Sequence, residues 1–138
     1  MATTLKKGPL QVSITETYTL NGREHSVTTK TVYEDIRQTS SRIVTIPTAG
    51  GLQVLDFADT VNSAGEYADA DVRFLRITNL DDENFITVET AGAPSIPATR
   101  ITAGSSFLLS DLDGITSITA TADSAPCDIE IFIASVEA

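Results

Sequence analysis

Side chains that could support nucleophilic catalysis are scarce in this chain. Its single histidine is His25 and its single cysteine is Cys127, so a Ser–His–Asp or Cys–His arrangement would have to include one imidazole. His25 stands between Glu24 and Ser26 beside a predicted turn, where we expect it to be exposed and without a catalytic partner. The sequence also lacks a Gly-x-Ser-x-Gly elbow and the glycine-rich patterns that bind phosphates. These observations predict that the protein is not an enzyme and has no catalytic residues.

Nitrogen and sulfur ligands for metals are equally few. One histidine and one cysteine are too few for a typical zinc site, and a single cysteine forms no intramolecular disulfide. Cys127 continues the apolar face of a predicted strand, so we interpret it as a small buried hydrophobic residue rather than a reactive thiol. We therefore predict no cofactor-binding and no metal-binding residues.

Carboxylates are the chemical groups present in number, and they cluster in three predicted turns. The clusters are Asp69-x-Asp71, Asp81-Asp82-Glu83 and Asp111-x-Asp113-Gly114. The last resembles the start of a calcium-binding loop, but its closing position is Ala122 rather than an acidic residue. Glycoside hydrolysis would need paired acids in an aromatic cleft, and the chain has three Tyr, five Phe and no Trp. We interpret the clusters as turn-forming, solubilising groups, with a structural calcium ion as the alternative.

The elements that would position such groups are predicted to be strands. Thr, Ile and Val make up 42 of the 138 residues, and these β-branched side chains favour a pleated surface. Apolar residues alternate with period two along the chain, and no window of helical length has helical spacing. After a polar break at 38–41, we expect strands at 42–46, 52–57, 72–78, 85–90, 96–102, 105–110, 115–122 and 127–136, with the longest and most mobile loop at 58–70.

The last predicted strand has the clearest alternation in the chain. Its two faces are Cys127, Ile129, Ile131 and Ile133 on one side and Asp128, Glu130, Phe132 and Ala134 on the other. Because one face is almost entirely isoleucine, we expect this strand to lie in the middle of a sheet with that face in the core.

A long hairpin is predicted before these strands. Residues 10–20 have one apolar and one Thr-rich face, Asn21-Gly22 is a strong hairpin-turn signal, and the return strand runs from about His25 to Ile36. Glu16 interrupts the apolar face, so we expect that face not to be fully buried in the isolated subunit. Long hairpins of this kind often project from a body or add to a neighbour's sheet, and we therefore expect contacts with another chain.

The number of strands predicts the architecture. Roughly ten strands exceed what a single open sheet usually holds, which favours two packed sheets. We predict one all-β domain over residues 1–138, in which residues 40–138 form a jelly-roll-like two-sheet β-sandwich of about eight strands. Residues 1–36 form the appended N-terminal hairpin, an arm for subunit contacts. A domain of this length buries enough surface to fold without disulfides.

Charge is distributed unevenly along the chain, whose net charge is −10. Residues 1–50 carry six Lys or Arg and four Asp or Glu, whereas residues 51–138 carry three and fifteen. So acidic a body repels phosphate backbones, and we predict no nucleic-acid partner. The asymmetry fits simple solubility, or alternatively a basic N-terminal segment that binds an acidic neighbour. We recognise no signal peptide and no bilayer-spanning apolar run, so we expect a soluble protein with no membrane partner.

Two segments and the N-terminal layout are similar to a known group of proteins. The segments are VRFLRITNLDDENFITV at 72–88 and ITATADSAPCDIEIFIAS at 118–135. The N-terminal part adds Leu20-Asn-Gly22, a Thr-rich return strand and Ile43-Val-Thr-Ile-Pro47. Together these patterns resemble small virion proteins of tailed bacteriophages, especially marine and cyanobacterial ones. The motifs are strand-and-turn patterns, so the resemblance implies a virion component without fixing head or tail, and it implies no site residues.

Residue patterns and resemblance together predict a non-enzymatic virion structural protein. A capsid decoration (cement) protein, which binds the shell and its own copies as a trimer or other cyclic homo-oligomer, explains both. Its partners would be capsid or other virion proteins, and its location the virion, assembled in the host cytoplasm. A neck, tail or baseplate component is the alternative of the same class. A receptor- or glycan-binding module is the alternative of another class, although Tyr18, Tyr33 and Tyr67 are scattered in sequence. A hydrolase comes last.

Overall fold

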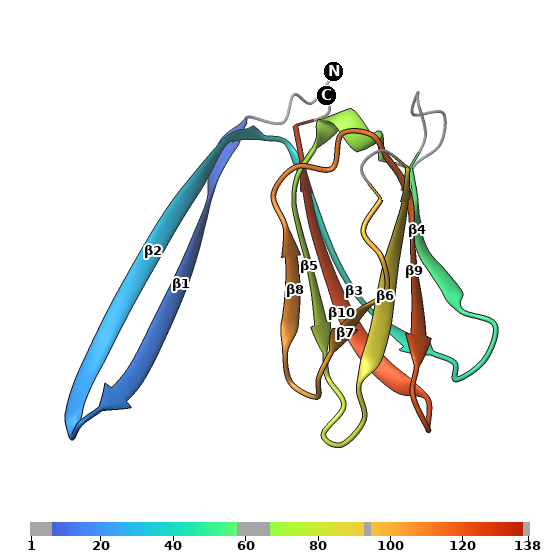
Figure 1. Ribbon diagram of the computed structural model, residues 1–138. Coiled ribbons are helices and arrows are strands. Elements are labelled where there is room, and N and C mark those ends of the chain that lie inside the picture. Colours follow the sequence, from blue (N-terminus) through green and yellow to red (C-terminus); the bar gives the residue numbers. More distant parts are fainter. Residues whose placement is uncertain (1–6, 58–66, 93–94, 137–138) are drawn as a thin grey trace.

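The computed structural model describes residues 7–57, 67–92 and 95–136, which form ten strands (Figure 1). A hairpin of β1 (Gly8–Leu20) and β2 (Arg23–Ile36) projects from a body of two four-stranded sheets. The strands of the body are β3 (Gln38–Ile46), β4 (Leu52–Asp56), β5 (Val72–Asn79), β6 (Ile86–Gly92), β7 (Thr99–Ile101), β8 (Ser106–Leu109), β9 (Ile115–Ala122) and β10 (Cys127–Ser135).

The body is an antiparallel β-sandwich with jelly-roll connectivity. One sheet has the order β3-β10-β5-β8 and the other β4-β9-β6-β7. If the strands of the body are numbered one to eight from β3 to β10, the first sheet has the order 1-8-3-6 and the second sheet has the order 2-7-4-5. These two orders are those of a jelly roll. The prediction of an all-β, jelly-roll-like sandwich with an appended N-terminal hairpin is confirmed.

The core lies between the two sheets, and β10 contributes the most regular part of it. β10 pairs with β3 on one side and with β5 on the other, so it is a central strand as expected. Its inward residues Cys127, Ile129, Ile131 and Ile133 are all buried, which confirms the predicted core face. They pack with buried residues of the opposite sheet, namely Val54, Ile86, Val88, Ile101, Ile115, Ile118, Ala120 and Ala122.

Two strands differ in extent from the sequence prediction. The expected polar break at 38–41 is part of β3, because its antiparallel ladder to β10 continues to the pair Gln38–Ser135. At this edge of the sheet one side of the strand stays hydrated, so small polar residues are tolerated. The strand expected at 96–102 is confined to β7, since Pro97 has no N–H for a ladder and the Ile96 N–H donates to Thr90 Oγ1 instead.

The outward face of β10 is a further correction. Alternation put Ala134 on the polar, outward side of the strand, yet Ala134 is fully buried. The base of the hairpin covers it in a second apolar cluster made of Leu10, Val12, Tyr33, Ile36, Phe74, Phe132, Ala134 and Val136. A period-two pattern cannot reveal this, because the cover comes from a segment about a hundred residues away in the sequence.

Helical structure within the described residues is limited to η1 (Asp69–Asp71), a single 3-10 turn. The described part of the chain therefore has no helix with the length and hydrophobicity to cross a bilayer. Most of the loop expected at 58–70, namely residues 58–66, lies outside the described residues.

Candidate functional site

The hairpin owes its regular register to its turn. Asn21 and Gly22 have φ angles of +52° and +75°, the backbone that a two-residue type I′ turn requires. From that turn the pairs run without a bulge from Leu20–Arg23 to Leu10–Tyr33. The return strand accordingly begins at Arg23, two residues before the predicted start at His25.

The two faces of the hairpin differ in character. Cross-strand partners share a face, so the register assigns every residue. The face that meets the body, here called the inner face, carries Leu10, Val12, Ile14, Glu16, Tyr18 and Leu20 from β1 and Arg23, His25, Val27, Thr29, Thr31 and Tyr33 from β2. The outer face carries Gln11, Ser13, Thr15, Thr17 and Thr19 from β1 and Glu24, Ser26, Thr28, Lys30 and Val32 from β2.

Only the base of the inner face is packed. Tyr33 contacts Phe74 with ring centroids 5.7 Å apart, and Phe74 contacts Phe132 at 6.1 Å. Nearer the turn, four apolar side chains of the inner face are 43–60% exposed: Ile14, Tyr18, Leu20 and Val27. An isolated two-stranded hairpin is at best marginally stable in water, so this exposed apolar stretch is the clearest candidate for a binding surface.

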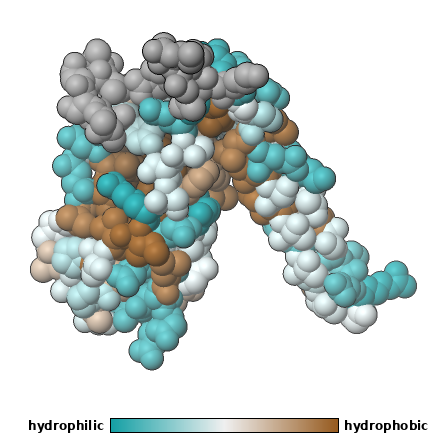
Figure 2. Space-filling model, turned by 180° about the vertical axis from the view of Figure 1, so that it is seen from behind, coloured by the Kyte–Doolittle hydropathy of each residue, from teal (hydrophilic) through white to brown (hydrophobic). Residues whose placement is uncertain are grey.

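The hairpin and the body enclose a groove, visible in Figure 2 as the notch between them. It contains a pocket of about 420 Å³. Val12 and Ile14 line this pocket from the hairpin together with Gln11 and Ser13, and Phe74, Leu108 and Phe132 line it from the outward face of the β3-β10-β5-β8 sheet together with Arg76 and Ser106. Arg76 bonds to Glu130 at 2.6 Å. Apolar and polar side chains therefore share the lining of the pocket.

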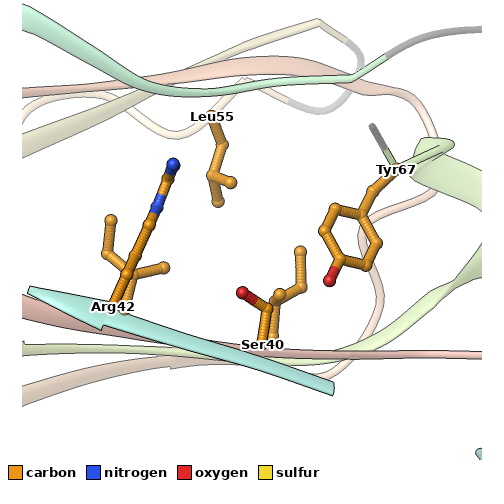
Figure 3. A pocket seen from close by; sticks show the side chains of 6 residues that line it. Ser40, Arg42, Leu55 and Tyr67 are labelled. Atoms are coloured by element: carbon orange, nitrogen blue, oxygen red, sulfur yellow. The ribbon is translucent and has the colours of Figure 1, made fainter. Parts of the chain in front are cut away.

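A second, smaller cavity of about 150 Å³ lies between the sheets (Figure 3). Ser40, Arg42, Leu55 and Tyr67 line it together with Ile131 and Ile133. The Arg42 guanidinium already donates a hydrogen bond to the Val54 carbonyl. The volume is half the lower bound of typical small-molecule sites, so the cavity accommodates a few water molecules or one small ion.

The single histidine and the tyrosines are placed as follows. His25 is exposed, as expected, and its ring stacks on Tyr18 with centroids 5.0 Å apart. Tyr18 and Tyr33 are on the same face of the hairpin, which their sequence separation did not suggest. Tyr67 lines the small cavity between the sheets instead. The three tyrosines therefore form no common rim.

The acidic clusters take part in turn formation. The Asp81 carboxylate accepts the N–H groups of Asn84 and Glu83 at 2.6 and 3.0 Å, and these two bonds, that of Asn84 first, lower the pKa of Asp81. Asp111 accepts the N–H of Asp113 at 3.1 Å in the same manner. This agrees with the turn-forming interpretation.

The first and third acidic clusters meet in space. The Asp69 carboxylate accepts the Gly114 N–H at 2.8 Å, a contact between positions 45 residues apart that no local pattern predicts. The described residues contain no group of three or more His, Cys, Asp or Glu placed to hold a metal ion.

The structure also identifies a buried polar residue that the sequence did not single out for the core. Asn79 has no exposed surface; its amide group donates to the carbonyls of Asn84 and Ile101, and its oxygen accepts the Asp81 N–H. Three satisfied hydrogen bonds tie the end of β5 to β7 and to the acidic turn. Asn79 is thus structural, and the sequence signal for it was the Asn-rich turn alone.

Cys127 is buried, as predicted. Burial raises the pKa of its thiol above 9.0, with smaller contributions from nearby carboxylates, Asp81 first. The thiol is therefore protonated at neutral pH, which agrees with its interpretation as a small hydrophobic residue.

No protein-family model matches this chain, and no curated protein does so.

Proposed function

We propose that this chain is a non-enzymatic structural protein of a tailed-phage virion, and specifically a capsid decoration (cement) protein that binds the shell and its own copies. The observation that carries the proposal is the exposed apolar stretch of the hairpin's inner face. Surfaces of this kind, rimmed by polar residues, mark sites of protein association. The similarity of 72–88 and 118–135 to small virion proteins supports the choice of the virion.

The body has the features of a module that holds a shape. Its interior is made mainly of β-branched residues, Asn79 is hydrogen-bonded there, and Asp81 and Asp111 accept backbone N–H groups of their own turns. Three of the four edge strands are short, since β7, β8 and β4 have three, four and five residues, and only β3, with nine, leaves a long free edge. An assembly protein needs such a stable body behind its contact surface.

The charge of the hairpin argues against a basic arm that is attracted by an acidic neighbour. The hairpin itself carries two basic residues, Arg23 and Lys30, against Glu16, Glu24, Glu34 and Asp35. The basic excess of the N-terminal half therefore lies outside the hairpin strands. Arm binding should accordingly rest on apolar burial with local charge pairs, rather than on a basic arm attracted by an acidic neighbour.

The proposal is tested on purified particles. We expect the protein to be a stoichiometric particle component, and as an outer decoration it should leave the particle in high salt or chelator before the main shell proteins do. Retention on an isolated tail after the shell has come apart would assign the chain to the tail or neck instead. Glycan hydrolysis by the pure protein, abolished by a change in one acidic turn, would contradict a structural role.

A further inference from the structure

We infer that the inner face of the hairpin binds the same face of a second copy of this chain, with the two hairpins antiparallel. This inference rests on the self-association in the proposed function and names its surface, but it does not depend on the virion. The face is apolar beyond the part that the body covers, through Ile14, Tyr18, Leu20 and Val27. A layer on top of it would supply the packing that a two-stranded hairpin lacks.

The charges on the inner face select a second copy as the occupant. Glu16 lies in the middle of this face, while Arg23 and His25 lie next to the turn. If two inner faces stack antiparallel about a two-fold axis at the Tyr18–His25 pair, the Glu16–Val27 pair of one copy faces the Leu20–Arg23 pair of the other, and Glu16 comes near Arg23. Parallel stacking would instead bring the two Glu16 carboxylates towards each other. The opposite charges of the face are therefore paired in the antiparallel orientation with this register.

The shape of the molecule permits this arrangement. The hairpin diverges from the β3-β10-β5-β8 sheet from its base to its turn, so the inner face opens towards the mouth of the groove (Figures 1 and 2). A partner hairpin that enters turn-first would lie between the inner face and the sheet. Its Thr-rich outer face would then meet the polar part of the sheet, where Thr78 and Ser106 share a hydroxyl hydrogen bond of 2.8 Å.

The chain offers a closely matched pair of variants to test the surface. Val27 and Val32 are on the same strand and are 51% and 50% exposed, but they lie on the inner and outer faces respectively. Val27→Thr should raise the dissociation constant of the full-length dimer roughly tenfold or more, because each dimer would bury two added hydroxyls. Val32→Thr should leave it unchanged. Sedimentation of the purified full-length proteins over a concentration series measures both constants.

Charge reversal tests whether the contact joins two chains in the antiparallel orientation. Glu16→Arg and Arg23→Glu should each weaken the homodimer, because like charges would then face each other at both symmetric positions. Mixing the two variants should restore a heterodimer, since each Arg would face a carboxylate of the other chain. Restoration on mixing cannot come from a change in the folding of either chain alone.

The outcomes separate the alternatives. Weakening by Val27→Thr but not by Val32→Thr, together with restoration on mixing, supports the inference. A wild-type chain that stays monomeric at all concentrations overturns it and leaves another protein, such as a shell subunit, as the occupant. An oligomer that both valine variants weaken equally, or that neither affects, also overturns it. None of these results bears on where the protein lies in a particle. The proposed location is therefore tested independently, by the experiments on purified particles.

Discussion

Gly92, at the end of β6, is a residue whose replacement the backbone forbids. Its φ is +117°, and a Cβ there would lie 2.1 Å from the Gly114 carbonyl oxygen and 2.9 Å from the Thr116 nitrogen. Gly92→Ala should therefore lower the free energy of unfolding by about 2–5 kcal/mol, from strain and forced displacement of β9. Gly104→Ala is the matched control, because Gly104 also has a positive φ, +75°, but open space around it. Denaturant unfolding should show a clearly smaller loss for the control.

Asp81 makes stability depend on pH in the acidic range. Its pKa is lowered below 3.8 by the N–H groups of Asn84 and Glu83, so its contribution is fully present above the unfolded-state pKa and is lost as pH falls through the lower, folded-state pKa. The wild type should thus be more stable than Asp81→Asn near neutral pH, and this difference should shrink below pH 3.8. Asp82→Asn removes a charge from the same turn but keeps both bonds. Thermal unfolding over a pH series measures the stability of both variants. If the stability of Asp82→Asn and of Asp81→Asn depended on pH in the same way, this role of Asp81 would be contradicted.

Among the strands, β10 contributes the most regular set of core residues. Ile131 is 1% exposed in the centre of that strand, and Ile131→Ala should cost about 2–5 kcal/mol through lost burial and a cavity. Ile43 on the adjacent strand β3 is 64% exposed and faces outward, opposite Glu130. Ile43→Ala should therefore change the free energy of unfolding by less than about 0.5 kcal/mol. Similar losses for both variants would mean that the core does not lie between the sheets as described.

The hairpin is an element that the body does not need for its core. None of the buried residues of the main core belongs to β1 or β2. Deletion of residues 1–36 should accordingly leave a folded β-rich domain of lower stability, because Phe74, Phe132 and Ala134 lose their cover. Circular dichroism and thermal unfolding check this. An unfolded truncated chain would show instead that the hairpin is part of the folding unit.

The sequence predicted elements where a local pattern determines them. The Asn21-Gly22 turn and the alternation of β10 are local, because backbone φ and the pleat act within a few residues. The burial of Ala134 and the bond from Gly114 to Asp69 depend on segments that are distant in sequence. The exposed inner face was partly predictable, since Glu16 on an apolar strand face argues against full burial. That Arg23 and His25 share this face required the register of the hairpin.

At the scale of the whole molecule, a jelly-roll body carries an arm whose apolar face its own body covers only at the base. This division fits a protein that gains stability on assembly, because a partner that binds only the folded chain stabilises the folded state by mass action. The full-length chain should therefore join particles, whereas a chain without residues 1–36 should remain folded but unbound. Incorporation of both chains to the same extent would show that the arm is not the contact surface.

Imaging of intact particles is the most direct test of whether this protein is, as we propose, a structural component on the outside of a phage capsid. Electron cryo-microscopy of purified particles should show density for the jelly-roll body on the outer shell surface, with the hairpin in contact with a neighbouring chain. Density in the neck, tail or baseplate would contradict the decoration role while keeping the protein in the virion. Absence of the protein from purified particles that are otherwise complete would contradict any structural role in the virion.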